Sequence, residues 1–150
     1  MKIIDNNLIN YRKTTYDKVL FESYKCPLSP ELMQSYRRRE THPKHDPYQS
    51  EIWAVGITVL CAALNSKIKK YYDWKEEKIK FKNIRKAEEQ MREIGFSEQL
   101  ISCIQGCLEE SESRRSTHRE MMAFLLPHQE SIRKGEFGFN IVQEHHHTEP

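Results

Sequence analysis

One segment, from Ser50 to Leu64, limits what the rest of the chain can fold into, because nearly all of its side chains are apolar. A helix on a protein surface has a single apolar stripe, so a segment that is apolar on every side is expected to be buried. The run is shorter than the about 20 apolar residues of a membrane-spanning helix, yet it is long for a strand. It therefore predicts a buried helix, with a turn and cap supplied by Asp46, Pro47 and Ser50.

Gly56 lies inside this predicted helix. A glycine there costs about 1 kcal/mol relative to alanine. It suggests that another part of the backbone approaches the helix closely; an uncompensated defect is the alternative.

Apolar spacing predicts further helices on either side. A short helix should end near Glu40, and the polar, lysine-rich residues 65–82 should connect the buried helix to an amphipathic helix over residues 83–94. Gly95 should end that helix, and Ser97 should cap the next one. The apolar face of this next helix consists of Leu100, Ile101, Ile104, Cys107 and Leu108.

Composition narrows the class of protein. The 150 residues fit one domain, and a net charge of +2 gives no basic signal for a nucleic-acid partner. The four cysteines form no C-x-x-C pair, which favours free thiols in a reducing compartment over disulfides. The N-terminus has no apolar signal-peptide segment, so we expect a cytoplasmic protein without a membrane partner. His42 and His45 have no partner cysteine nearby, so no metal site is expected.

The segment Asp46–Ile57 resembles the central helix of the large lobe of eukaryotic protein kinases. That helix usually contains D-x-W-S-x-G-I/V; here Glu51 occupies the aspartate position, while Trp53 and Gly56 match. The resemblance implies a mainly α fold, the helical C-terminal lobe of a protein kinase-like domain.

Two flanking segments extend the resemblance. Leu28–Leu32 is similar to the kinase A-P-E-L element, and Cys107–Met121 is similar to C-L-x-x-D-P-x-x-R-P-T-x-x-E-L. In the family, the arginine at the position of Arg115 forms a buried ion pair with the glutamate at the position of Glu31. The resemblance therefore implies a Glu31–Arg115 pair. Independently of it, Thr117 with Glu120 has the pattern of a helix capping box.

The N-terminal residues carry the weakest part of the match. KIIDNNLI resembles the kinase segment K-I-x-D-F-G-L, whose aspartate binds the metal ion on ATP; Asp5 is retained, but asparagines replace the next two residues. An ordinary turn is the alternative for D-N-N. Residues 10–28 would be the activation loop, in which Thr14, Thr15 and Tyr16 are candidate phosphorylation sites; a plain solvated loop is the alternative.

The resemblance covers residues 1–126, with an activation-loop-like segment over 1–28, a helical core over 29–126 and a tail over 127–150. The chain contains no Gly-rich loop, no ATP-binding strand lysine and no H-R-D catalytic loop. Together with these missing motifs, the resemblance implies a C-terminal lobe without the N-terminal lobe and the catalytic loop. Such a lobe is no enzyme as it stands, and we expect it to bind no nucleotide or other cofactor.

These expectations lead to one principal hypothesis, a catalytically inactive kinase-like lobe that serves as a structural or protein-interaction module in a cytoskeletal or other large assembly. The alternative is a fragment of an active ATP-dependent serine/threonine protein kinase whose N-terminal part is missing; transcript sequence upstream of Met1 separates the two. A third hypothesis is an unrelated all-helical interaction protein, which a surface position of the Ser50–Leu64 helix would favour.

Overall fold

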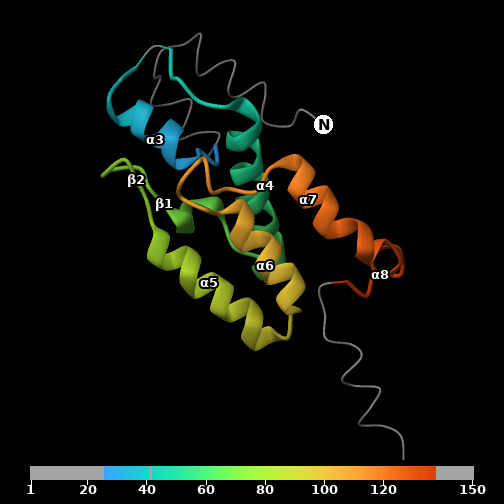
Figure 1. Cartoon of the computed structure of the whole chain (residues 1–150). Helices are drawn as coiled ribbons and strands as arrows, with labels where there is room; N and C mark the ends of the chain where they lie inside the picture. The colour runs from blue at the N-terminus through green and yellow to red at the C-terminus, as the bar shows by residue number, and fades with distance from the viewer. Residues whose placement is uncertain (1–25, 41, 138–150) are drawn as a thin grey trace, which may run out of the picture.

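The computed structural model describes residues 26–40 and 42–137, which form a mainly helical domain with a two-stranded antiparallel hairpin (Figure 1). The elements in chain order are α3 (Pro30–Arg37), α4 (Pro47–Leu64), the 3-10 helix η1 (Ile68–Tyr71), β1 (Tyr72–Asp73), β2 (Lys78–Ile79), α5 (Phe81–Ile94), α6 (Glu98–Cys107), α7 (His118–Leu125), the 3-10 helix η2 (Leu126–His128) and α8 (Gln129–Arg133). The mainly α fold class is confirmed. Asp5, Thr14, Thr15 and Tyr16 lie outside the described residues.

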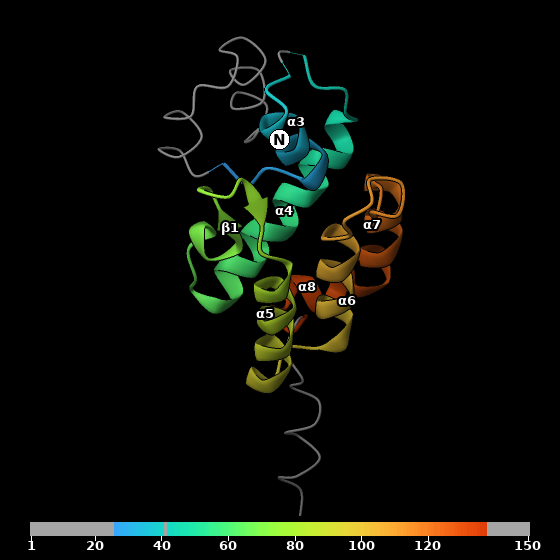
Figure 2. The same ribbon diagram turned by 90° about the vertical axis from the view of Figure 1, so that its left-hand side faces the viewer.

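Helix α4 is the predicted buried helix, and α5, α6 and η1 pack against it (Figures 1 and 2). It begins at Pro47, with Asp46 as its N-cap: the carboxylate accepts a hydrogen bond from the backbone N–H of Tyr48 at 2.9 Å. The expectation of burial on every side is wrong, because Val55 and Thr58 lie on an exposed strip of the helix. The run is therefore a core helix with one open face.

Helices α5 and α6 lie next to each other and both pack against α4 (Figure 2). The predicted caps are confirmed. Gly95 ends α5 with φ of 109°, a conformation in which a side chain would be strained, and the Ser97 hydroxyl accepts a hydrogen bond from the backbone N–H of Leu100. Helix α3 ends at Arg37, three residues before the predicted boundary at Glu40.

The hairpin was not expected from the polar composition of residues 65–82. Tyr72 pairs with Ile79 across β1 and β2, and both side chains are buried with Tyr71. The Tyr72 hydroxyl accepts a hydrogen bond from Trp53 Nε1 at 3.0 Å and donates one to the Leu28 carbonyl at 2.7 Å. These bonds fix the hairpin against α4 and the residues that precede α3.

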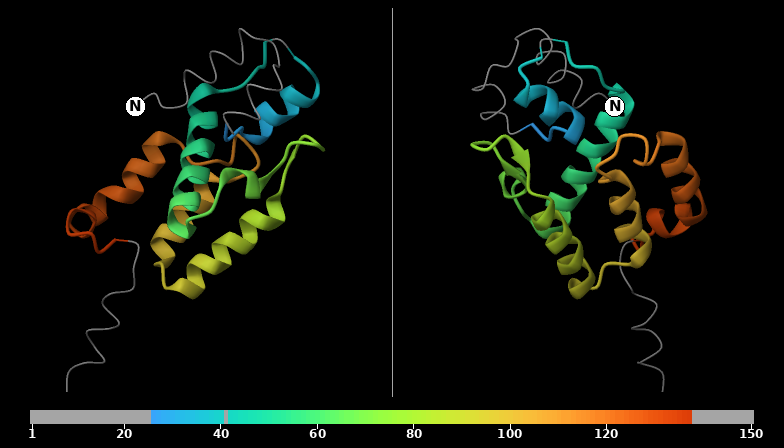
Figure 3. Two further views of the ribbon diagram at one scale, coloured as in Figure 1. Left: turned by 180° about the vertical axis from the view of Figure 1, so that it is seen from behind. Right: turned by 60° about the vertical axis from the view of Figure 1, so that its left-hand side comes forward.

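Helical structure continues past residue 127, where the sequence predicts a tail. Thr117 caps α7 by accepting a hydrogen bond from the Glu120 N–H at 3.1 Å, as the capping pattern predicts. Helices α7 and α8 lie on the side of the domain away from the hairpin (Figures 1 and 3). No residue of α7 is buried. Among the described helices, none combines the length and apolar character needed to cross a bilayer.

All four cysteines are free, and they differ in accessibility. We expect iodoacetamide to alkylate Cys103 first in the folded protein and to leave Cys26 and Cys107 unmodified. Burial raises the pKa of Cys26 to about 12. A hydrogen bond joins Cys103 and Cys107. This bond, together with burial, raises the pKa of Cys107, and the same bond lowers the pKa of the half-buried Cys103 to about 7. Because the thiolate is the reactive form, Cys103 should react fastest.

Mass spectrometry of peptides after short alkylation pulses measures the order. The same pulses in guanidinium chloride are the control, since unfolding should make the four rates similar. Alkylation of Cys26 before Cys103 in the folded protein would contradict the burial described for α6 and the residues before α3.

Candidate functional site

Glu31 and Arg115 form a bidentate ion pair. Glu31 lies in the first turn of α3, and Arg115 lies in the turn between α6 and α7. The two Nη atoms of the guanidinium approach the two carboxylate oxygens at 2.7 and 2.9 Å. The Arg115 side chain is fully buried, whereas 14% of the Glu31 side chain is exposed. The pair implied by the resemblance is therefore present, and it joins residues 84 positions apart.

The Arg115 side chain has further partners. Its Nε donates to the Glu109 carbonyl at 3.0 Å, Nη1 donates to the Gln49 carbonyl at 2.8 Å, and Nη2 donates to the Glu110 carbonyl at 3.3 Å. The guanidinium carbon lies 5.4 Å from the centre of the Trp53 ring, within cation–π range. The fork geometry of arginine thus satisfies a buried charge with one carboxylate, three carbonyls and one aromatic face.

Glu31 is also connected to the start of α4. The Ser50 hydroxyl donates to a Glu31 carboxylate oxygen at 3.2 Å, and His45 Nδ1 lies 2.8 Å from the same hydroxyl. Burial alone would raise the pKa of the Glu31 carboxyl, but the hydrogen bonds and charge of Arg115 hold that pKa below its ordinary value of 4.5. Glu31 therefore stays ionised at neutral pH and keeps α3, α4 and the α6–α7 turn together.

This lowered pKa predicts how stability responds to acid. A carboxyl whose pKa is lower in the folded than in the unfolded state stabilises the fold above its unfolded pKa, and that contribution is lost as the pH falls through the folded pKa. We therefore expect the stability difference between wild type and Glu31→Gln to be largest near pH 6 and to shrink as the pH falls below about 4.5. Urea unfolding midpoints between pH 6 and pH 3 measure it. A constant difference across that range would show that Glu31 titrates alike in both states.

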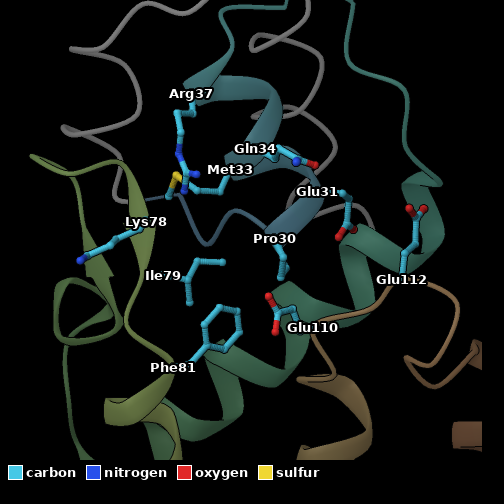
Figure 4. Close-up of a pocket in the computed structure, with 10 residues that line it drawn as sticks. All are labelled: Pro30, Glu31, Met33, Gln34, Arg37, Lys78, Ile79, Phe81, Glu110 and Glu112. Atoms are coloured by element: carbon cyan, nitrogen blue, oxygen red, sulfur yellow. The ribbon is translucent and has the colours of Figure 1, made fainter.

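A groove of about 340 Å³ opens beside the ion pair (Figure 4). Its walls are α3, strand β2 with the first residue of α5, and the α6–α7 turn, three parts of the chain that are distant in sequence. The lining residues are Pro30, Glu31, Met33, Gln34 and Arg37 from α3, Lys78 and Ile79 from β2, Phe81 from α5, and Glu110 and Glu112 from the turn. Apolar side chains thus form a floor between an acidic and a basic end.

The remaining predicted structural residues lie on α4. Trp53 is fully buried beneath the ion pair, and Gly56 faces the end of α6. A Cβ atom at Gly56 would lie 2.8 Å from Cys107 Cβ and 2.8 Å from Leu108 Cδ2, so the predicted close approach is real but involves the side chains of a neighbouring helix end. Glu51 is only half-buried and takes no part in the ion pair.

The sequence did not predict several buried polar contacts in and around the site. Ser50 was expected to cap α4, yet it lies inside that helix and bonds Glu31. Gln49 accepts from Arg115 through its carbonyl and donates from its amide to the Arg115 carbonyl at 3.0 Å. Glu88 is buried between α5 and α6, where it accepts from Gln105 at 3.2 Å. Within residues 26–40 and 42–137, no cluster of histidine, cysteine and carboxylate side chains is arranged to hold a metal ion.

Comparison of the chain with protein-family models, with curated proteins and with solved structures finds no match in any of the three. The resemblance to protein kinases is therefore an expectation from the motif residues alone.

Proposed function

We propose that this chain is a kinase-like large lobe without catalytic activity, which acts as a structural or protein-interaction module in a larger assembly. The observation that carries the proposal is the buried, bidentate pair of Glu31 and Arg115. Glu31 and Arg115 belong to two sequence motifs that resemble the family and lie far apart in the chain, and the two residues are 84 positions apart. The resemblance predicts that these two side chains meet. A chance similarity has no reason to bring the two side chains together.

The surroundings of the pair support the same proposal. Trp53 lies against the Arg115 guanidinium, and Gly56 makes room for the end of α6. These positions matched the central-helix pattern, and both have a packing role in α4. A surface position of this helix would have favoured an unrelated helical protein, and the largely buried α4 gives that alternative no such support.

Exposed apolar side chains support a protein partner. Tyr48 on α4 is 67% exposed, and Met122 and Leu126 at α7 and η2 are 57% and 58% exposed. The Tyr48 ring lies 5.8 Å from the His118 ring at the start of α7, one helical turn before Met122. Large apolar side chains exposed close together usually mark a contact with another protein. In this proposal the chain works in the cytoplasm with protein partners, and it binds neither a nucleotide nor nucleic acid.

Two measurements on the full chain test the proposal. Native size-exclusion chromatography of the tagged protein from its own cells should give a complex larger than one chain, whereas the purified recombinant chain should elute smaller. Magnesium-ATP should leave the melting temperature of the recombinant chain unchanged, with an active kinase as the positive control. A well-folded monomer in both preparations would contradict the assembly role, and a nucleotide-dependent shift would contradict the absence of nucleotide binding.

A further inference from the structure

We propose that the groove beside the Glu31–Arg115 pair binds an extended segment of a partner protein in which an apolar side chain lies between a basic and an acidic one. This inference rests on the proposed function, because it names the chemistry of the partner that such a module would bind. The groove combines an apolar floor with charged groups of opposite sign at its two ends.

The floor is built to contact an apolar side chain. Met33 from α3 and Ile79 from β2 form its buried part, and the half-buried ring of Phe81 forms its edge (Figure 4). A volume of about 340 Å³ is near the lower limit of ordinary ligand sites, about 300–1,000 Å³. A few side chains of a bound segment would therefore fill it.

At the acidic end, one carboxylate has no partner among the described residues. Glu110 is exposed, and its side chain makes no hydrogen bond or ion pair with the described residues; it points toward the space between Pro30 and Phe81 (Figure 4). Glu112 adds a second negative charge, although one of its oxygens already accepts from the Asp46 N–H at 2.6 Å. Glu31 contributes little, since Arg115 neutralises it. A lysine or arginine of the partner would pair with Glu110 and lay its aliphatic stem along Phe81.

The other end of the groove is basic. Arg37 holds its guanidinium in place by donating from Nε and Nη2 to the Glu77 carbonyl at 3.2 and 3.0 Å, and a carbonyl leaves the positive charge unneutralised. Lys78 adds charge at the rim, although its ammonium group points away from the groove (Figure 4). An acidic side chain of the partner would lie at this end. Opposite charges at two fixed points select the order of side chains more than they add affinity.

Fluorescence anisotropy with short labelled peptides tests the proposal. The probes are nine-residue peptides with an arginine–leucine–aspartate core in either chain direction, and a matched peptide with alanine in place of arginine. At least one arginine peptide should bind the full chain. The alanine peptide should bind at least tenfold more weakly, and the Glu110→Arg variant should bind the arginine peptide at least tenfold more weakly than wild type does. A peptide with glutamate in place of arginine should bind Glu110→Arg better than wild type.

Glu93→Arg is the matched control, because it makes the same charge change on an exposed residue in the last turn of α5, away from the groove. It should leave peptide binding unchanged. Equal weakening by the two variants, or no binding at millimolar peptide, would overturn the inference. So would self-association that Glu110→Arg abolishes, since the occupant would then be a second copy. If native size-exclusion chromatography shows the larger complex but the peptides do not bind, the inference is wrong and the proposed function stands. If the chain forms no larger complex in its own cells, the proposed function itself is contradicted.

Discussion

Arg115→Ala should lower the free energy of unfolding by about 3–5 kcal/mol, the usual effect of removing one partner of a buried ion pair. The substitution would leave the largely buried Glu31 carboxylate without its cationic partner, and the carbonyls of Gln49 and Glu109 without the hydrogen bonds that Arg115 donates. It would also remove the cation that lies over the Trp53 ring. Because small domains are stable by only about 5–15 kcal/mol, the variant should unfold at a much lower urea concentration.

Arg114→Ala is the matched control. Arg114 is exposed and makes no side-chain hydrogen bond or ion pair within the described part of the chain, so its removal should change stability by less than about 0.5 kcal/mol. The double variant Glu31→Gln with Arg115→Met should recover part of the loss, because it removes both charges and fills much of the space with an apolar chain. Small and equal effects of the two arginine substitutions would show that the ion pair does not stabilise the fold.

The helices were predictable where local chemistry decides them. The apolar run identified α4, and Gly95 and Ser97 marked the boundary between α5 and α6 because their caps depend on neighbouring residues only. The hairpin was not predictable in the same way. Its strands have two residues each, too few for an alternating pattern, and the burial of Tyr72 depends on distant partners in α4 and before α3.

In the candidate site, too, some contacts could be predicted from the sequence and others depend on the whole fold. The pair of Glu31 with Arg115 was predictable only through the resemblance to a family in which both positions are known. The carbonyls that complete the Arg115 environment could not be predicted, since every residue has a carbonyl and only the fold selects which ones meet. The groove has no local pattern either, because α3, β2 and the α6–α7 turn form it together.

The open strip on α4 has a related cause. Apolar content alone predicts burial, but it does not specify which sides of the helix other elements cover. Val55 and Thr58 are exposed on α4, while Gly56, between them in sequence, faces α6 in close contact. One helix thus has a side specified by tight packing and a side available for other contacts.

Gly56→Ala should destabilise the domain although alanine is the better helix former. The new Cβ would lie 2.8 Å from Cys107 Cβ and from Leu108 Cδ2, closer than such atoms approach in proteins, and both neighbours are buried and cannot swing aside. Overpacking of this kind costs about 1–3 kcal/mol, against a gain of about 1 kcal/mol in helix propensity. Gly56→Val adds two more methyl groups at the same place and should cost more. Urea unfolding of both variants measures the effect.

The exposed position Thr58 in the same helix calibrates the propensity term. Thr58→Ala should be more stable than Thr58→Gly by about 1 kcal/mol, because no packing constraint acts there. The replacement of glycine by alanine should therefore stabilise α4 at position 58 and destabilise it at position 56. Opposite signs at two positions half a turn apart would demonstrate that close packing against α6, and not backbone preference, requires the glycine. If alanine stabilises the helix at both positions, Gly56 is an uncompensated defect and its match to the kinase pattern no longer supports the proposed function.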